Sequence, residues 1–146
     1  MMMKTFIPKI DPANRKWYIV DLQGATLGRV AVQVASILRG KTKPIFTPNI
    51  DCGDHVIAIN AGGVKVTGAS KPEQLTYYRY TGYPGGLRAV TFAEQMRKHP
   101  EDTFSHAVWR MLPKTKLGKK QFTKLHVYAG ADHPHQAQKP EMLKLS

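Results

Sequence analysis

The chain lacks most of the features that mark secreted, membrane-spanning or metal-dependent proteins. Cys52 is its only cysteine, so an internal disulfide and a zinc site built from several cysteines are both excluded. No stretch approaches the roughly 18 consecutive apolar residues that a transmembrane helix needs. The first eight residues include one lysine and no apolar run long enough for a secretory signal. We therefore expect a cytoplasmic protein that works in a reducing compartment.

Acidic residues are scarce, and this shortage sets the electrostatics of the chain. The chain contains 10 Asp and Glu residues and 22 Lys and Arg residues, which gives a formal net charge of +12 at pH 7. A positive field of this size favours a polyanionic partner, because each phosphate neutralised by a lysine or arginine releases condensed counterions. A nucleic acid and an anionic membrane surface both meet this requirement. The charge narrows the class of partner and leaves the activity open.

The positive charge is spread along segments that also carry core periodicity. A disordered basic tail would instead concentrate its charge at one end, in low-complexity sequence. Here the stretch from Ala131 onward balances to zero. With 146 residues, 42% of them hydrophobic, the chain predicts one domain over residues 1–146. We expect its α/β core to span residues 16–130, followed by an extended tail over residues 131–146.

The first half of the chain has the pattern of a βαβ unit. Residues 17–22 form a short run rich in β-forming side chains, and apolar residues then recur every three or four positions over residues 27–38, as in an amphipathic helix. Gly40 is placed to end this helix. Two further β-type runs follow, over residues 55–60 and 64–67. Strand, helix and strand in this order predict a parallel pairing.

The second half mixes short helices and strands with a loop rich in glycine and proline. Thr91 is a candidate N-cap, and two prolines are placed to stop helices. We expect a strand over residues 73–80, helices over residues 91–99 and from residue 102 or 103 to 112, a basic helical segment over residues 114–124, and a last strand over residues 125–129.

A cluster of lysines in the basic segment is the strongest chemical feature of the sequence. Its members are Lys114, Lys116, Lys119, Lys120 and Lys124, with no acidic residue among them. On a helix, Leu117, Gln121 and Lys124 share one side, while Lys116, Lys119 and Lys120 share another. One side can then dock on the core and the other can meet phosphate. A helical face that is merely solvated explains the same pattern.

The loop from Arg79 to Arg88 (RYTGYPGGLR) has a basic residue at each end. Its tyrosines, Tyr83 among them, and its glycines suit close approach to irregular RNA. An ordinary Pro-Gly turn with tyrosines in the core fits equally well. Lys41 and Lys43, which follow the first helix, are ambiguous in the same way, because a helix C-terminus stabilises nearby cations without any ligand.

Two groups of residues resemble catalytic or metal sites. Cys52 and His55 place a thiol near an imidazole, as in a catalytic pair. However, sequence neighbours entering a strand usually point to opposite sides. A turn before a strand accounts for the same residues without any catalytic role. In the tail, His133 and His135 lack the further ligands of a metal site. We expect these two histidines to contact phosphates or bases, or to be simply exposed. The glycines at positions 62, 63 and 68 match no nucleotide-binding motif.

Four ordered segments, which together cover most of the chain, resemble the family of large-subunit ribosomal protein thirteen of the bacterial type. They are WYIVDLQGATLGRVAVQVASILRGK (residues 17–41), DCGDHVIAINAGGVKVTG (residues 51–68), YRYTGYPGGL (residues 78–87) and MLPKTKLGKKQFTKLHVYAGADHPHQAQKP (residues 111–140). Several ordered motifs of this kind are far more specific than any single one.

This resemblance implies a three-layer α/β/α fold with a small, mostly parallel sheet of about four strands, together with extended basic loops and a tail. It also implies a structural component of the large ribosomal subunit that binds large-subunit ribosomal RNA, contacts neighbouring ribosomal proteins and supports early assembly. No enzymatic activity, cofactor, metal, small-molecule substrate or membrane partner is expected. The alternatives are a regulator that binds messenger RNA away from the ribosome, and a small hydrolase that uses Cys52 and His55.

The residues that we expect to contact RNA lie in four separate parts of the chain. They are Lys41, Lys43, Arg79, Tyr83, Arg88, Lys114, Lys116, Lys119, Lys120, Lys124, His133 and His135.

Overall fold

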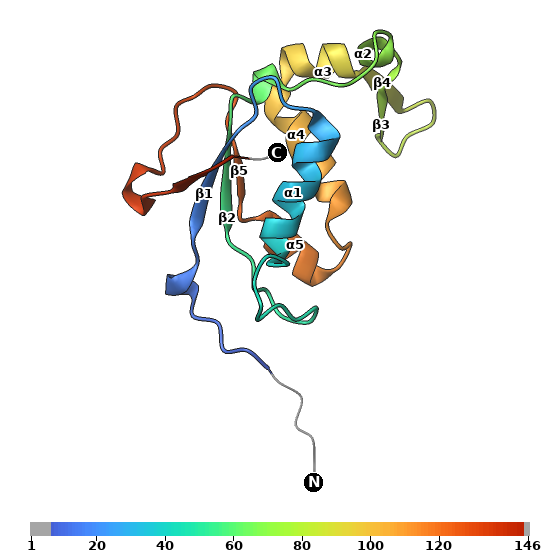
Figure 1. The fold of residues 1–146 in the computed structure, drawn as a ribbon. Coiled ribbons are helices and arrows are strands. Elements are labelled where there is room, and N and C mark those ends of the chain that lie inside the picture. The colour runs from blue at the N-terminus through green and yellow to red at the C-terminus, as the bar shows by residue number, and fades with distance from the viewer. Residues whose placement is uncertain (1–6, 145–146) are drawn as a thin grey trace.

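The computed structural model describes residues 7–144 and contains a small parallel β-sheet. Its four strands lie in the order β5-β2-β1-β6, and every neighbouring pair is parallel. The strands are β1 (Trp17–Asp21), β2 (His55–Ile59), β5 (Leu125–Val127) and β6 (Glu141–Leu143). Parallel strands need crossover connections, which is why helices and long loops separate them in the chain (Figure 1).

Helix α1 (Leu27–Arg39) connects β1 to β2 and supplies much of the core. It is amphipathic, and its apolar side packs with Val20, Val56 and Ala58 of the sheet. The helix ends at Gly40, whose φ of 80° is in the left-handed region that glycine tolerates best. A side chain at this position would also collide with the backbone of Cys52.

Two further helices, α4 (Pro100–Met111) and α5 (Lys116–Phe122), lie beside α1 on the same face of the sheet, and a third, α3 (Phe92–Lys98), packs against α4 (Figure 1). The Thr91 hydroxyl caps α3 by accepting a hydrogen bond from the Glu94 amide, and Thr115 caps α5 in the same way. Phe104 and Val108 of α4 are buried in the core, so α4 is packed firmly against the rest of the protein.

The C-terminal tail covers the second face of the sheet. Trp17, His55 and His126 point to this face from three strands, and the His135 ring of the tail lies 5.2 Å from the Trp17 ring and 4.6 Å from the His126 ring. The Trp17 and His55 rings are stacked, with centroids 4.1 Å apart. The tail then forms a short 3-10 helix, η3 (Gln136–Gln138), before β6 pairs with β1.

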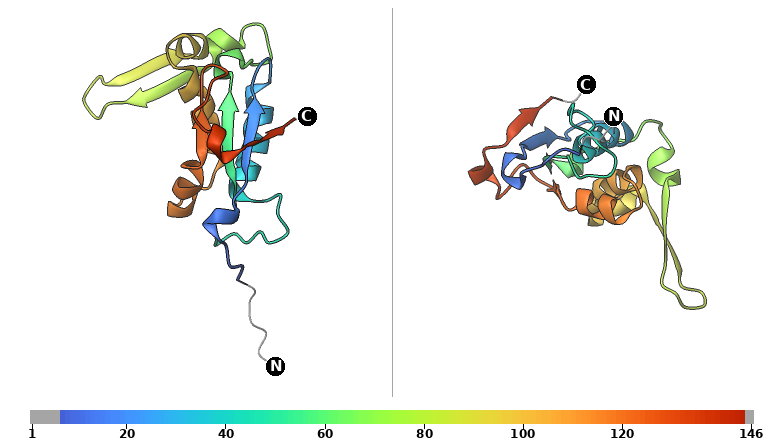
Figure 2. Two further views of the ribbon diagram at one scale, coloured as in Figure 1. Left: turned by 90° about the vertical axis from the view of Figure 1, so that its left-hand side faces the viewer. Right: turned by 90° about the horizontal axis from the view of Figure 1, so that it is seen from below.

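An antiparallel hairpin projects from the body of the molecule (Figures 1 and 2). It consists of β3 (Thr76–Tyr80) and β4 (Leu87–Thr91) and follows the single-turn helix α2 (Lys71–Gln74). Its base is fixed by the backbone hydrogen bond from the Phe92 amide to the Leu75 carbonyl. Two 3-10 helices, η1 (Pro12–Asn14) and η2 (Ala61–Gly63), complete the structure.

The structure confirms the α/β class, the small parallel sheet and the parallel βαβ unit. Of the three expected layers, the one on the second face is formed by the tail and η3 rather than by α-helices. Residues 64–67 do not form a strand, since the backbone there makes only a bridge between Thr26 and Lys65. The fourth strand comes instead from the tail, where residues 141–143 pair with β1 although their sequence has no clear period.

Several elements in the second half differ from the prediction. The strand expected over residues 73–80 begins at Thr76, because residues 73 and 74 belong to helix α2. Helix α4 begins at Pro100, because proline is well suited to the first position of a helix, where its missing N–H is not needed. Strand β4 was not predicted, and it exists because it pairs with β3. No helix within residues 7–144 is long and apolar enough to cross a membrane.

The ring cluster on the second face predicts a stability that depends on pH. Burial, helped by the charge of Lys124, lowers the pKa of His55 to about 4. The folded state therefore disfavours protonated His55, whereas the unfolded chain binds this proton at the ordinary pKa of 6.5. The contribution of neutral His55 to the stability of the folded protein is complete above pH 6.5 and is lost as the pH falls toward 4. The variant His55→Phe keeps a ring against Trp17 but has no group that titrates. We expect its free energy of unfolding to fall by roughly 1 to 2 kcal/mol less than that of the original protein when the pH is lowered from 7 to 4.

Urea unfolding followed by circular dichroism across this pH range measures the difference. Comparing the two proteins cancels the carboxylates that titrate in the same range. Equal losses in both proteins would mean that His55 is not the group responsible.

Candidate nucleic-acid interface

A cationic groove of about 1,260 Å³ lies between the hairpin and helices α4 and α5. One face of the hairpin forms one wall, and the exposed sides of the two helices form the other. The basic side chains that line it are Arg79, Arg88, Arg110 and Lys119, and Asp102 is the one acidic residue in the lining. Four cations against one carboxylate give the groove a net positive charge.

Arg79 and Arg88 are directly opposite each other on the paired strands of the hairpin. Side chains alternate along a strand, so both arginines lie on the same face as Tyr77 and Val90. Like charges in directly opposed positions destabilise a sheet. Among the described residues, neither arginine forms an ion pair with an acidic side chain. A phosphate placed between them would turn this repulsion into attraction.

The base of the hairpin and the groove wall are connected through His106 of α4. The Tyr77 ring meets the His106 ring edge-on, with centroids 5.7 Å apart. The Arg110 Nε donates a hydrogen bond to the His106 Nε2 over 3.1 Å, which requires a neutral imidazole. Burial and the charge of Arg110 lower the pKa of His106 and so favour this neutral form. His106 therefore orients Arg110 toward the groove without adding charge.

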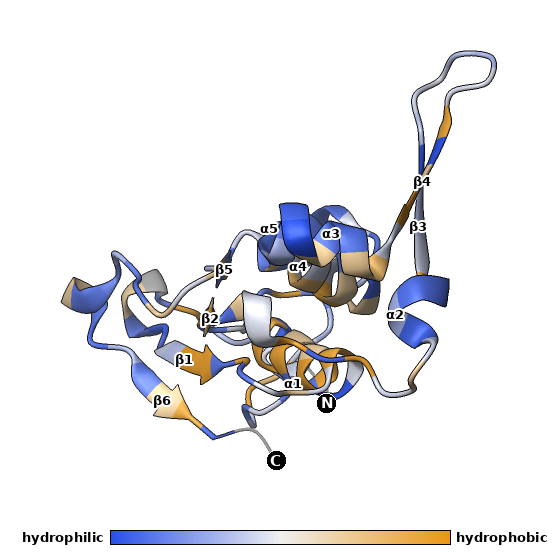
Figure 3. Cartoon of the chain, turned by 90° about the horizontal axis from the view of Figure 1, so that it is seen from above, coloured by the Kyte–Doolittle hydropathy of each residue, from blue (hydrophilic) through white to orange (hydrophobic). Residues whose placement is uncertain are grey.

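Helix α5 presents its lysines as its spacing predicts. Lys116, Lys119 and Lys120 are exposed, whereas Gln121 and Gly118 are buried against the rest of the protein. Gly118 sits directly against the carbonyl of Pro113, where a larger side chain would collide. Figure 3 shows the hydrophilic outer side of this helix. Lys114, just before the helix, is exposed as well.

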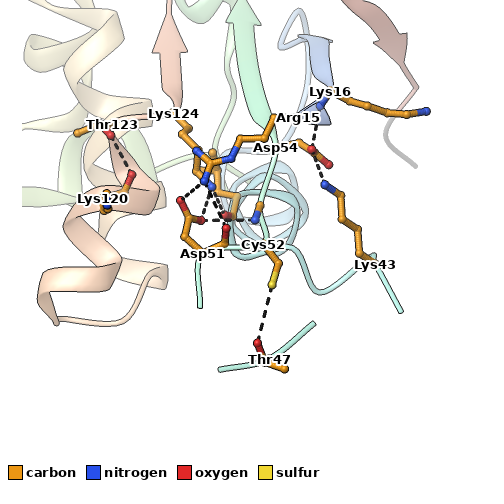
Figure 4. Close-up of polar contacts among 12 residues, drawn as sticks. Arg15, Lys16, Lys43, Thr47, Asp51, Cys52, Asp54, Lys120, Thr123 and Lys124 are labelled. Atoms are coloured by element: carbon orange, nitrogen blue, oxygen red, sulfur yellow. Dashed lines mark hydrogen bonds and ion pairs between the residues drawn. The ribbon is translucent and has the colours of Figure 1, made fainter. Parts of the chain in front are cut away.

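Lys124 does not contact solvent, which corrects its assignment as an RNA-binding residue. Its side chain is only 3% exposed, forms an ion pair with Asp51 and donates a hydrogen bond to the Leu38 carbonyl over 3.1 Å (Figure 4). Burial lowers the pKa of Lys124, and the hydrogen bond and charge of Asp51 oppose that shift. The sequence already indicated that Lys124 could be buried. On a helix, Lys124 shares one side with Leu117 and Gln121, which is the side that can dock on the core.

Lys43 is also engaged inside the protein. Its Nζ lies 2.6 Å from the Asp54 carboxylate, which is 1% exposed and also accepts a hydrogen bond from the Lys16 amide (Figure 4). The Lys43 side chain is 26% exposed, so it has little room for a second anion. Lys41, two residues earlier, is exposed and stays a candidate for phosphate contact.

The predicted residues of the tail lie on the opposite face of the sheet from the groove. His135 is held in the ring cluster, where its Nε2 and the Tyr128 hydroxyl form a 2.8 Å hydrogen bond. His133 is half-buried, and its Nδ1 has no hydrogen-bond partner. Tyr83, at the tip of the hairpin, is 75% exposed. The predicted residues therefore do not form one continuous site.

The groove contains two residues that the sequence did not single out. Arg110 and His106 lie one helical turn apart on α4 and meet the hairpin only in the folded protein. A spacing of four residues between a histidine and an arginine was visible in the sequence. Nothing in the sequence, however, indicated that the hairpin would fold over this side of α4.

The structure leaves the hydrolase alternative without an accessible nucleophile. Cys52 is 1% exposed, and its thiol faces the Ile45 carbonyl at 3.6 Å and the Thr47 hydroxyl at 3.9 Å. Within residues 7–144, no group of three or more His, Cys, Asp or Glu side chains is arranged to hold a metal ion.

Comparison with known proteins assigns the chain to a family. The family model described as ribosomal protein L13 matches residues 15–134. The chain belongs to the ribosomal protein L13 family. A relative from Geobacillus kaustophilus is 54% identical over 144 residues, which cover 99% of both chains. A relative from Lachnospira eligens is 56% identical over 142 residues, which cover 97% of this chain and 99% of the relative.

A third relative, from a Cyanothece species, is 54% identical over 144 residues and is covered over 96% of its length. All three relatives bear the name large ribosomal subunit protein uL13. Membership of the L13 family confirms the resemblance drawn from the sequence, together with the prediction of a ribosomal protein rather than an enzyme.

The contrast between Lys124 and Lys120 yields a test of this L13-family structure. Lys124→Met removes one of the two cationic partners of the buried Asp51 carboxylate, the other being Arg15, and we expect it to lower the free energy of unfolding by about 3 kcal/mol. Lys120→Met, on the exposed side of α5, is the matched control and should change stability by less than about 0.5 kcal/mol. Urea unfolding at pH 7 measures both. Equal stability of the two variants would show that the buried ion pair does not hold this region together.

Proposed function

We propose that this protein is a structural constituent of the large ribosomal subunit that binds large-subunit ribosomal RNA and supports early assembly of the subunit. The observation that carries the proposal is the cationic groove, above all the opposed pair Arg79 and Arg88 on one of its walls. The names of the relatives, all large-subunit proteins, support the same partner.

The groove binds phosphate from two rigid walls. Arg79 and Arg88 extend from paired strands, whereas Arg110 and Lys119 extend from helices seated on the core. Phosphate contacts of this kind fix the position of the RNA backbone and read no sequence. Because the two walls belong to different parts of the fold, RNA segments in the groove are held in one relative geometry. The exposed lysines of α5 extend the cationic surface beyond the groove.

We further infer that residues 1–146 act as one domain, that the protein contacts neighbouring large-subunit proteins and that it resides on cytoplasmic ribosomes. Pairing of β6 with β1 supports the first point, because the tail completes the sheet built from residues 17–127. The names of the relatives support the other two points, since a large-subunit protein works on the ribosome among other ribosomal proteins.

Replacing the opposed arginines should weaken RNA binding and reduce its salt dependence. For the double variant Arg79→Gln and Arg88→Gln, we expect the slope of log K against log salt to become less negative by roughly 1 to 2, because up to two phosphate contacts are lost. Filter binding to large-subunit ribosomal RNA between 50 and about 300 mM salt measures the slope. Lys139→Gln, in the tail on the other side of the sheet, is the matched control. An unchanged slope in the arginine variant would contradict the role of the groove.

Sedimentation of a cell lysate tests the cellular role. We expect the protein to co-migrate with the large subunit and to stay with it through a moderate-salt wash, since multiple phosphate contacts hold it. A slow peak free of ribosomes would instead favour the regulator of messenger RNA and contradict the proposed function.

A further inference from the structure

The face of the hairpin that points away from the groove carries large exposed side chains. Tyr80 and Leu87 lie on this face, because side chains alternate along the strands and these two residues are paired with each other. They are 64% and 62% exposed, and Tyr83 at the tip is 75% exposed. We call these three residues the hairpin outer face.

The hairpin outer face has no partner within the protein. Among the described residues, neither of its two tyrosine rings contacts another ring, in contrast to Tyr77 on the groove side, which meets His106. A two-stranded ribbon of this kind is marginally stable by itself, so large exposed side chains on its outer side indicate a surface that becomes covered on binding.

The chemistry of the whole hairpin favours a polyanion with flat rings as the occupant. Residues 74–93 contain no acidic side chain, whereas Arg79 and Arg88 give the ribbon two positive charges. Each arginine is the chain neighbour of a residue of the hairpin outer face, Arg79 of Tyr80 and Arg88 of Leu87. Cations next to exposed aromatic rings are the combination that single-stranded nucleic acid binds, with its phosphates on the cations and its bases on the rings.

The tip of the hairpin is shaped for close approach. Gly82 and Gly85 adopt φ values of 90° and 72°, in the left-handed region that other residues rarely adopt, and no atom lies within 4 Å of the place where a side chain would begin. Apart from the chain neighbours, the space beside these two glycines is therefore open, which leaves room for a flat ring next to the backbone there.

We propose that the hairpin outer face stacks on unpaired bases of the RNA whose phosphates occupy the groove. The protein then selects an internal loop or bulge over uninterrupted duplex. The bases of a continuous A-form helix are stacked on each other and lie in grooves that side chains read poorly, whereas unpaired bases can stack on tyrosine. This inference rests on the proposed function, because it names the kind of RNA that the groove holds.

The test compares two synthetic RNA hairpins of equal length, one fully paired and one with an internal loop of three purines that includes 2-aminopurine. The full chain is titrated with each. We expect it to bind the loop RNA about tenfold more tightly, as one or two stacked bases provide, and to quench 2-aminopurine fluorescence on binding.

The decisive variant is Tyr80→Leu with Tyr83→Leu, which keeps apolar bulk and removes both rings. It should bind the two RNAs equally, leave duplex affinity unchanged and quench no fluorescence. Tyr80→Phe with Tyr83→Phe is the matched control that keeps the rings and should retain the tenfold preference. Both substituted positions are exposed, so thermal unfolding should show the same stability in all three proteins.

The outcomes separate the inference from the proposed function. A tenfold preference that survives in the leucine variant, or no preference in the original protein, overturns base stacking. The proposed function still stands in that case if the Arg79 and Arg88 variant loses affinity for both RNAs. Leucine variants that keep full RNA selectivity but no longer assemble into the large subunit would show that a protein covers this face, which also overturns the inference.

Discussion

The buried ion pair between Lys124 and Asp51 is the interaction on which the arrangement of the other elements depends. Lys124 follows α5 and precedes β5, Asp51 precedes β2, and the Leu38 carbonyl that Lys124 also binds lies at the end of α1. One ammonium group therefore joins three segments that are far apart in the sequence. Gly53 is required beside it, because a side chain there would come within 2.6 Å of the Lys124 Nζ and collide with Leu38. The position of α5, and with it one wall of the groove, follows from this junction.

A protein with such an excess of positive charge uses its few carboxylates for folding. Asp51 and Asp54 are buried, and they form ion pairs with Lys124, Arg15 and Lys43. These three cations are therefore engaged within the protein. Among the described residues, the four cations that line the groove, Arg79, Arg88, Arg110 and Lys119, form no ion pair with a carboxylate. This division explains how one chain combines a stable core with a surface suited to RNA: internal cations are neutralised within the protein, and external cations are left for phosphate.

The two faces of the sheet perform different tasks. One face packs against helices through apolar side chains such as Val20 and Val56, and this packing positions the groove. The other face is covered by rings, with His135 of the tail resting on Trp17 and His126. Neutral histidines suit this place, since burial lowers the pKa of His126 and disfavours its charged form. His135, which the sequence offered as an RNA ligand, thus helps to hold the tail.

The sequence by itself determined the α/β class, the βαβ unit and the exposed lysines of α5, because apolar periodicity and capping residues such as Thr91 act over a few neighbouring positions. Tertiary structure alone decided which cations line the groove. Burial of Lys124, the contact between Arg110 and the hairpin, and the pairing of β6 with β1 all join residues far apart in the chain. Local pattern carries no information about such contacts, since they arise from how the elements pack, and packing is settled by the whole fold.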